Sequence, residues 1–246
     1  MNPPDSFALY LHIPFCRSKC AYCDFFSIKT ENNIENEYIS ALINEARLRK
    51  KQFGAKTWFS IYIGGGTPSL LAPQQIVFLL NELCQICPLE KDAEVTVECN
   101  PDDITEDFLQ IIKNSPVNRL SLGIQSLNDK SLQIIGRRAK LAENLRAIEL
   151  INKFWLCKKS AKSGSAGRRF SADLICGLTL QTEKDFLEDL QKIINCGADH
   201  ISLYSLMLEE NTRLFDMVEK GLCKINQDES DEWWILGRDL LKKNGF

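Results

Sequence analysis

The sequence alternates six short apolar runs with longer amphipathic segments, and this alternation constrains the fold more than any other feature. The apolar runs are rich in Ile, Val, Leu, Tyr and Phe, which are residue types that favour β-strands. Strands are predicted at residues 8–13, 58–63, 93–98, 118–123, 171–176 and 200–206. Most of these runs are almost continuously apolar, which is typical of strands that are covered on both faces.

Helices are predicted in the segments that separate and follow the strands, at residues 34–51, 73–84, 105–114, 142–152, 182–196, 211–220 and 228–243. Strands that alternate with helices predict an α/β fold with a parallel sheet and right-handed crossovers. A closed barrel of this type needs eight strand–helix units, whereas this chain supplies about six. We therefore expect one domain, residues 1–246, folded as an open, partial (β/α)6 barrel. Its functional residues should lie in loops that follow the strands.

The composition is that of a globular chain and argues against several functions. The 246 residues carry a net charge of −3, whereas a nucleic-acid-binding surface is usually strongly basic. No run reaches the roughly 18 apolar residues of a membrane span, and the N-terminus does not resemble a secretory signal. We therefore expect a cytoplasmic protein with no nucleic-acid partner and no membrane span. The basic segment within residues of about 156–170 is predicted to be a flexible loop.

The chain has ten cysteines, and three of them form the strongest chemical signal. Clustered cysteines in a reducing compartment indicate metal or redox chemistry. Cys16, Cys20 and Cys23 follow the first predicted strand with the spacing C-x3-C-x2-C. Three thiolates can hold three irons of a [4Fe–4S] cluster and leave the remaining iron open. Zinc is the alternative metal, but a structural zinc site requires four ligands, and no fourth Cys or His is evident nearby.

Polar or glycine-rich signals also follow the other predicted strands. Three consecutive glycines, Gly64 to Gly66, and Thr67 allow a ligand to approach the backbone closely, although a tight turn explains the glycines better when they are taken alone. Glu98 can accept hydrogen bonds from an ammonium group or a ribose, or it can simply precede a helix cap.

The remaining signals lie in the second half of the predicted sheet. Gln125 offers a donor and an acceptor, and Arg137 offers a planar fork that suits a carboxylate, unless it is only a surface arginine. Asp173 lies inside an apolar strand, where it is costly to bury without a partner such as a ribose diol. Backbone groups near Met207 are candidates for contact with an adenine.

The cysteine spacing, with Tyr22 before the last cysteine, resembles that of the radical S-adenosylmethionine (SAM) superfamily. In that family, the amino and carboxylate groups of SAM chelate the open iron. An electron from the reduced cluster then cleaves the sulfonium bond and gives a 5′-deoxyadenosyl radical. The resemblance therefore implies a [4Fe–4S] cluster and SAM as cofactors. It also implies a low-potential electron donor of the flavodoxin or ferredoxin type if radical chemistry occurs.

Several longer motifs resemble one branch of this superfamily, the oxygen-independent coproporphyrinogen III oxidases and the related HemW heme chaperones. The motifs are Tyr10-x-His-Ile-Pro-Phe-Cys, Gly-Gly-Gly-Thr-Pro-Ser, Glu-x-Asn-Pro, Gly-Ile-Gln-Ser and Asp-Leu-Ile-x-Gly-Leu. The positions that match SAM contacts of the family are Tyr10, Gly65, Gly66, Thr67, Glu98, Gln125, Arg137, Asp173 and Met207. The resemblance covers nearly the whole chain except the basic loop.

One position separates the two groups within this branch. The oxidases have a fourth cysteine two residues after the third, and this chain has Phe25 there, as in HemW. The resemblance therefore implies heme as cargo and apo-hemoproteins as acceptors. Oxidative decarboxylation of coproporphyrinogen, or another SAM-dependent radical reaction, is the alternative.

The chain departs from the family pattern at three points. Ala139 replaces a histidine, and Thr179-Leu180 replaces Pro-Gly. A His-Asn-x-x-Tyr-Trp heme motif, which belongs to the family's C-terminal domain, is absent from the 246 residues. We therefore expect this chain to correspond to the core domain alone.

Overall fold

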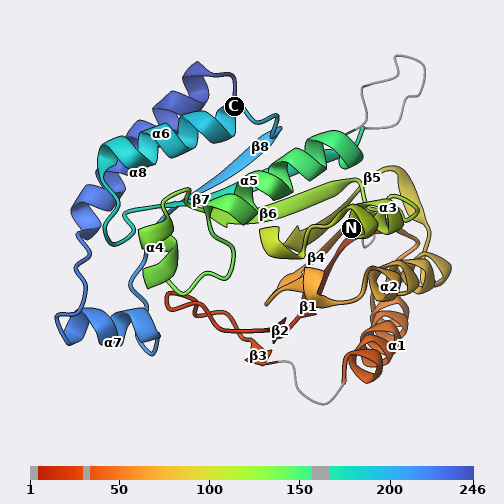
Figure 1. The fold of residues 1–246 in the computed structure, drawn as a ribbon. Helices are drawn as coiled ribbons and strands as arrows, with labels where there is room; N and C mark the ends of the chain where they lie inside the picture. The colour runs from red at the N-terminus through yellow and green to blue at the C-terminus, as the bar shows by residue number, and fades with distance from the viewer. Residues whose placement is uncertain (1–4, 30–33, 157–166) are drawn as a thin grey trace.

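The computed structural model describes residues 5–29, 34–156 and 167–246. Its centre is a six-stranded parallel sheet in which neighbouring strands follow the order of the sequence. The strands are β1 (Ser6–Ile13), β4 (Thr57–Gly65), β5 (Leu89–Cys99), β6 (Arg119–Gln125), β7 (Arg169–Cys176) and β8 (His200–Ser205). This topology confirms the predicted partial (β/α)6 barrel (Figure 1).

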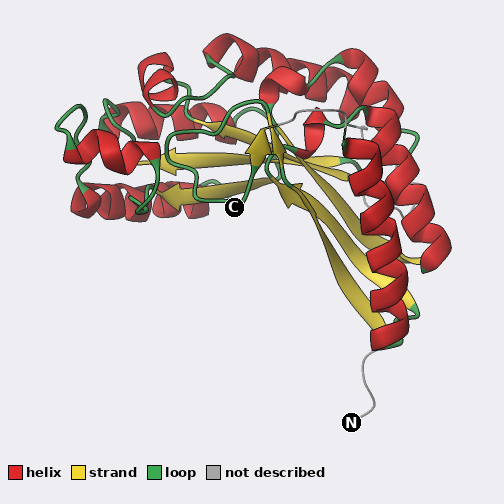
Figure 2. Ribbon diagram, turned by 90° about the horizontal axis from the view of Figure 1, so that it is seen from below, coloured by secondary structure: helices red, strands yellow, loops and turns green. Residues whose placement is uncertain are grey.

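Helices line the outer side of the bent sheet (Figure 2). Those that match predicted segments are α1 (Glu35–Phe53), α2 (Pro73–Ile86), α3 (Glu106–Ile112), α5 (Leu141–Leu150), α6 (Glu183–Ile194), α7 (Arg213–Glu219) and α8 (Gln227–Lys243). Hydroxyl groups of Thr105, Thr182 and Thr212 accept the N-terminal hydrogen bonds that begin three of these helices. Among the described residues, no helix is long and apolar enough to cross a bilayer.

Six short elements were not predicted from the sequence. They are the two-residue strands β2 (Phe15–Cys16) and β3 (Ile28–Lys29), the 3-10 helices η1 (Pro68–Leu70) and η2 (Pro101–Asp103), the helix α4 (Asp129–Ile134) and a π-helical turn, η3 (Ile151–Trp155). The strands β2 and β3 pair with each other in a separate small sheet at the base of the cysteine loop. Each of these elements is too short to show a period in the sequence.

The two faces of the main sheet differ in chemistry, which corrects the prediction of strands covered on both faces. The outer face is apolar and packs against the helices through buried side chains such as Ile63, Val97 and Leu122. The inner face presents polar side chains, among them Glu98 on β5, Ser121 on β6 and Asp173 on β7, which pair across neighbouring strands. The many β-branched residues made the runs look uniformly apolar, although polar residues alternate with them.

A second, smaller apolar cluster lies apart from the main core. Its buried members are Ala21, Leu132, Ile135, Ile175, Leu178, Leu206, Leu214 and Cys223. They come from the cysteine loop, α4 and the residue after it, the end of β7 and the loop that follows, the segment after β8, α7 and the segment after α7. This cluster therefore joins the loops at the end of the barrel where the site residues were expected.

The basic segment that was predicted to be a loop, at about residues 156–170, includes two arginines near its C-terminal end that the structure describes. Residues 157–166 lie outside the described part of the chain. Arg169 belongs to β7 and its guanidinium contacts Glu94 at 2.8 Å. The guanidinium of Arg168 lies 5.2 Å from the ring centre of Trp155 and donates to the Lys113 carbonyl oxygen at 2.6 Å. Both arginines are therefore held by the fold and do not belong to a free loop.

Candidate functional site

The three cysteines of the C-x3-C-x2-C motif line one small cavity of about 30 Å³. The backbone N–H of Cys23 donates to the carbonyl oxygen of Cys20 at 3.3 Å, and the Cys16 thiol lies 3.5 Å from Thr67 Oγ1. Burial raises the pKa of the Cys23 thiol, and the charges of Cys20 and Cys16 raise it further. The three thiols are thus close enough to influence each other electrostatically.

Among the described residues, no group of three or more His, Cys, Asp or Glu side chains converges closely enough to hold one ion. One zinc ion would draw all of its ligand atoms to within about 2.3 Å of itself. A polynuclear cluster binds each thiolate to a different iron, so its ligands stand farther apart.

Backbone hydrogen bonds fix the cysteine loop from three sides. The N–H of Ala21 donates to the carbonyl of Ile135 after α4, and the N–H of Leu214 in α7 donates to the carbonyl of Ala21, both at 2.8 Å. The N–H of Ile28 in β3 donates to the carbonyl of Pro14 at 2.8 Å. The loop is therefore held in a defined shape by elements distant in sequence.

The glycine motif lies directly against the cysteine loop. Gly65 has a φ of +118°, and its N–H donates to Glu98 Oε2 at 3.1 Å. A Cβ on Gly66 would come within 2.9 Å of the Cys16 sulfur and 2.8 Å of the Phe15 carbonyl oxygen. Glycine is therefore required at both positions, by backbone conformation at Gly65 and by close approach at Gly66.

A second and larger cavity, of about 480 Å³, adjoins the first. Seven predicted site residues line it, namely Cys23, Thr67, Glu98, Gln125, Arg137, Asp173 and Met207. Four residues line both cavities: Cys23, Thr67, Asn100 and Arg137. The ends of five strands and the cysteine loop thus meet around one space, as the sequence predicted.

Two carboxyl groups lie inside this larger cavity. Glu98 accepts hydrogen bonds from the Tyr62 hydroxyl at 2.7 Å and from Gly65 N–H at 3.1 Å. Asp173 accepts from the Ser121 hydroxyl at 3.1 Å. Burial raises the pKa of both carboxyls above their ordinary values, although these hydrogen bonds oppose the shift. Both groups are acceptors placed to receive a cationic or hydroxyl-bearing ligand.

Arg137 links the larger cavity to the cysteines. It donates to Asn100 Oδ1 at 2.6 Å and to the Gly123 carbonyl oxygen, and its Nη1 lies 3.8 Å from the Cys20 sulfur. Its buried Nε–H has no hydrogen-bond partner within the described residues. Buried polar groups are almost always paired, so this donor is available to a ligand with an acceptor group.

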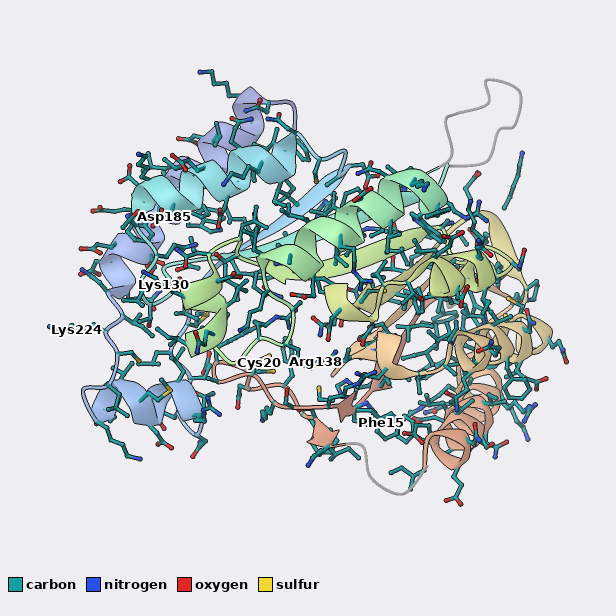
Figure 3. All side chains as sticks on the ribbon, viewed as in Figure 1. Phe15, Cys20, Lys130, Arg138, Asp185 and Lys224 are labelled. Carbon is teal, nitrogen blue, oxygen red and sulfur yellow. The ribbon has the colours of Figure 1, made fainter. Side chains whose placement is uncertain are left out.

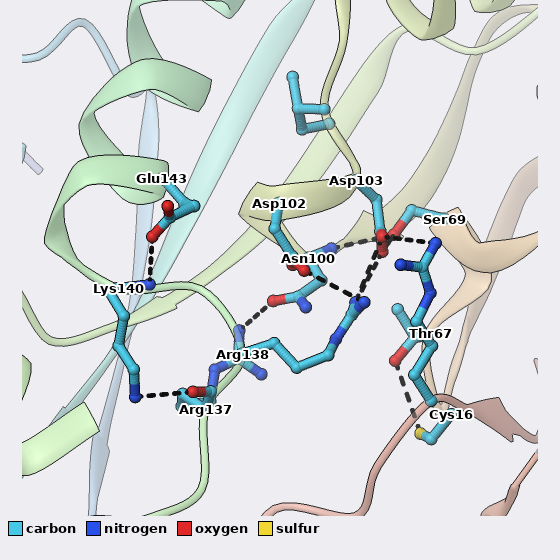
Figure 4. Close-up of polar contacts among 12 residues, drawn as sticks. Cys16, Thr67, Ser69, Asn100, Asp102, Asp103, Arg137, Arg138, Lys140 and Glu143 are labelled. Atoms are coloured by element: carbon cyan, nitrogen blue, oxygen red, sulfur yellow. Dashed lines mark hydrogen bonds and ion pairs between the residues drawn. The ribbon is translucent and has the colours of Figure 1, made fainter. Parts of the chain in front are cut away.

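A polar network next to Arg137 joins three strand-end loops (Figure 4). Arg138 pairs with Asp102 and Asp103, each at 3.1 Å, and Asp103 accepts from the Ser69 hydroxyl at 2.8 Å. Figure 3 places Arg138 beside Cys20 at the edge of the barrel. The sequence alone does not reveal this network, because its members are common polar residues with no distinctive spacing.

The other predicted positions surround the two cavities. Tyr10 is 57% exposed on the inner face of β1, where its hydroxyl lies 3.0 Å from His12 Nδ1. Gln125 has a φ of +66° at the end of β6, and Met207 is 66% exposed after β8. Tyr62 was missed, although its place opposite Tyr10 in the β1–β4 register identifies it as an inner-face residue.

Residues 10–193 match the model of the family described as the radical SAM superfamily. The chain is 37% identical over 246 residues to the heme chaperone HemW of Buchnera aphidicola from Acyrthosiphon pisum, and 35% identical over 247 residues to HemW of Escherichia coli. Each alignment covers 99% of this chain and 61% of the relative. A mouse protein named radical S-adenosyl methionine domain-containing protein 1, mitochondrial, is 36% identical over 240 residues, which are 97% of this chain and 52% of that protein.

The fold is similar to that of a solved protein structure. Coproporphyrinogen III oxidase, HemN, of Escherichia coli superposes with a TM-score of 0.80 at 24% identity, covering 99% of this chain and 54% of that chain. At this identity the similarity concerns the fold alone. The chain spans between about half and three-fifths of the length of these relatives.

Proposed function

Because the chain belongs to the radical SAM superfamily, we propose that it binds a [4Fe–4S] cluster through Cys16, Cys20 and Cys23, and SAM in the adjoining larger cavity. The observation that carries this proposal is that Cys23, Thr67, Asn100 and Arg137 line both cavities. A ligand in the larger space would therefore be in reach of a cluster held by the smaller one.

The residues present fit both groups. Three thiols form the donor set for the cluster. The backbone of Gly66 lies so close to Cys16 that no side chain fits between them. The unpartnered Nε–H of Arg137 fits a carboxylate, and Glu98 and Asp173 fit an ammonium group and a ribose diol. When bound, the cluster would supply an electron that can cleave the sulfonium C–S bond of SAM.

The chain's own residues would bind and orient the cofactor. We assign the amino-acid head group to Gly65, Gly66, Thr67, Glu98 and Arg137, the ribose to Gln125 and Asp173, and the adenine region to Met207, with Tyr10 at the inner-face rim. Tyr62 holds the Glu98 carboxylate by a 2.7 Å hydrogen bond, so it acts as a positioning residue. The apolar walls, including Ile175 and Leu206, would keep water from the reacting bond.

We further propose that the whole protein is a heme chaperone that delivers heme to apo-hemoproteins. The HemW names of the relatives at 35% and 37% identity support this function. Phe25 supports it independently, because it lines the larger cavity, is 67% exposed, and stands where the oxidases have their fourth cysteine. A low-potential electron donor of the flavodoxin or ferredoxin type would be a partner if SAM is cleaved. The nine described cysteines are free thiols, which supports the cytoplasm as the compartment.

Anaerobic reconstitution with iron and sulfide, followed by EPR with and without SAM, tests the cofactor proposal. We expect a reduced-cluster spectrum that changes when SAM is added, because SAM would bind the open iron. Substitution of Cys20 by Ala should abolish the spectrum, whereas Cys84→Ala, outside the motif, should preserve it. A spectrum that SAM leaves unchanged would contradict an open iron.

Heme titration with transfer to an apo-acceptor, beside a coproporphyrinogen decarboxylation assay, tests the chaperone proposal. We expect heme transfer without formation of vinyl groups. Detection of vinyl products would contradict the chaperone proposal and support the oxidase alternative. Both assays should be run on a full-length relative, such as HemW of Escherichia coli, as well as on these 246 residues.

A further inference from the structure

The larger cavity is strongly unbalanced in charge. Of the described residues that line it, Asp24, Glu98, Asp173 and Glu209 carry carboxyl groups, and Arg137 alone carries a positive charge. None of the four carboxylates forms an ion pair with another described residue. This excess contrasts with the inner-face carboxylate Glu94, which pairs with Arg119 at 3.0 Å and Arg169 at 2.8 Å. Negative charge is therefore neutralised at the far end of the sheet and left unpaired around the cavity.

The four carboxylates occupy two levels. Glu98 and Asp173 lie on the sheet, where they accept hydrogen bonds from Tyr62 and Ser121. Asp24 and Glu209 also line the cavity but are exposed, one directly after Cys23 and the other after β8. The cavity thus combines two hydrogen-bonded carboxylates on the sheet with two carboxylates that solvent reaches.

We propose that these carboxylates make the cavity selective for the charge of its ligand, with Asp24 and Glu209 as specificity-determining residues that favour a cationic sulfonium nucleoside over its uncharged thioether counterpart. The inference rests on the proposed SAM site and adds to it. SAM and S-adenosylhomocysteine share every group that Arg137, Glu98 and Asp173 would bind. They differ only in the sulfonium charge and one methyl group.

The size of the preference for SAM over the thioether distinguishes an effect of charge from an effect of shape. Burial of one methyl group changes an affinity by about fourfold. Attraction between a sulfonium and several carboxylates in a cavity of reduced dielectric constant adds to that factor and declines as salt is added. A preference well above about fourfold that falls with salt therefore reports on the carboxylates.

The experiment measures dissociation constants for both nucleosides by calorimetry on the anaerobically reconstituted protein. The test variant carries Asp24→Asn with Glu209→Gln. The control carries Glu37→Gln with Glu149→Gln, two exposed carboxylates on α1 and α5 that lie outside both cavities. All four positions are exposed, so the variants should fold, and both double variants change the net charge equally.

We expect the wild-type protein to bind SAM more than about tenfold more tightly than the thioether at low salt. The Asp24/Glu209 variant should lose at least about threefold of that ratio, and the control should keep it. The ratio should also fall with salt in the wild type and change less in the Asp24/Glu209 variant. An unchanged ratio in this variant, with SAM still bound, overturns the charge selectivity and leaves the SAM site standing. Failure of the wild type to bind SAM overturns both.

Discussion

At the scale of the residue, Gly66 is the position where the cysteine loop and the glycine motif come closest. A Cβ there would meet the Cys16 sulfur at 2.9 Å and backbone atoms of Phe15 at 2.8 Å, so Gly66→Ala must displace one of the two segments. We expect the variant to retain less than about half of the wild-type iron after reconstitution and to lose about 2 kcal/mol of stability.

Gly167→Ala is the matched control, because a Cβ at Gly167 meets no atom of the described residues within 4 Å. Iron and sulfide analysis, together with thermal unfolding, measures both effects. Equal iron contents in the two variants would show that the close approach of Gly66 to Cys16 is not required.

Leu180 is a strained residue in the loop that departs from the family pattern. It has a φ of +65° and is 60% exposed, so its side chain gains little from packing while its backbone adopts a conformation suited to glycine. Leu180→Gly should therefore raise the free energy of unfolding by about 1 kcal/mol. Leu222→Gly, at another exposed leucine, should lower it by about 0.5 kcal/mol. Denaturant unfolding measures both, and a loss at both positions would contradict strain at Leu180.

The sequence was informative about single residues where their chemistry is rare and uninformative where it is common. Three cysteines at close spacing, and an aspartate inside an apolar strand, singled out Cys16, Cys20, Cys23 and Asp173 as candidate site residues. Tyr62, Ser69 and Asp103 escaped notice, since tyrosine, serine and aspartate occur throughout surfaces and loops. Their roles depend on distances between loops, which local patterns do not encode.

At the scale of the element, α7 packs against the cysteine loop and holds it by a backbone hydrogen bond. Leu214 is fully buried in the smaller apolar cluster, and its backbone N–H holds the carbonyl of Ala21, which lies between two of the cysteines. Leu214→Ala should destabilise this cluster by about 3 kcal/mol and loosen the loop without unfolding the sheet.

Release of iron to a chelator measures this loosening. We expect Leu214→Ala to lose iron at least about tenfold faster than the wild type, if half of its energetic cost falls on the loop. Leu145→Ala, at a leucine that is 49% exposed on α5, should release iron at the wild-type rate. Similar rates of iron release in both variants would show that α7 does not contribute to the retention of iron.

Long elements were predictable and short ones were not, for a physical reason. Helix α6 shows an apolar stripe over several turns, and Thr182 caps it with a hydroxyl that accepts from Asp185 N–H. Helix α4 has only six residues, Asp129–Ile134, and two of its residues are buried. Tertiary contacts fix such a short helix, and a period cannot be read from it.

At the scale of the whole molecule, the polar inner face lowers the stability of the fold. Burial raises the pKa of Asp173, so the folded chain keeps this proton to a higher pH than the unfolded chain does. Both states are protonated below about pH 4, and the destabilisation develops as the pH rises through the folded-state pKa. The carboxylate thus opposes folding at neutral pH while it serves the ligand.

Asp173→Asn removes this opposition. The variant should gain about 1 kcal/mol of unfolding free energy near neutral pH, and the gain should shrink toward pH 4. Its affinity for SAM should fall in the same protein. Denaturant unfolding across this pH range measures the gain, and a difference that does not vary with pH would contradict the burial of a charged Asp173.

The division of the apolar interior into two clusters bears on the order of assembly. The larger cluster joins the sheet to its outer helices and includes no residue between Cys16 and Cys23. The barrel can therefore finish folding while the thiols are still bare, and delivery of iron and sulfide becomes a late step on a ready scaffold. The chain without iron should therefore keep its sheet and outer helices.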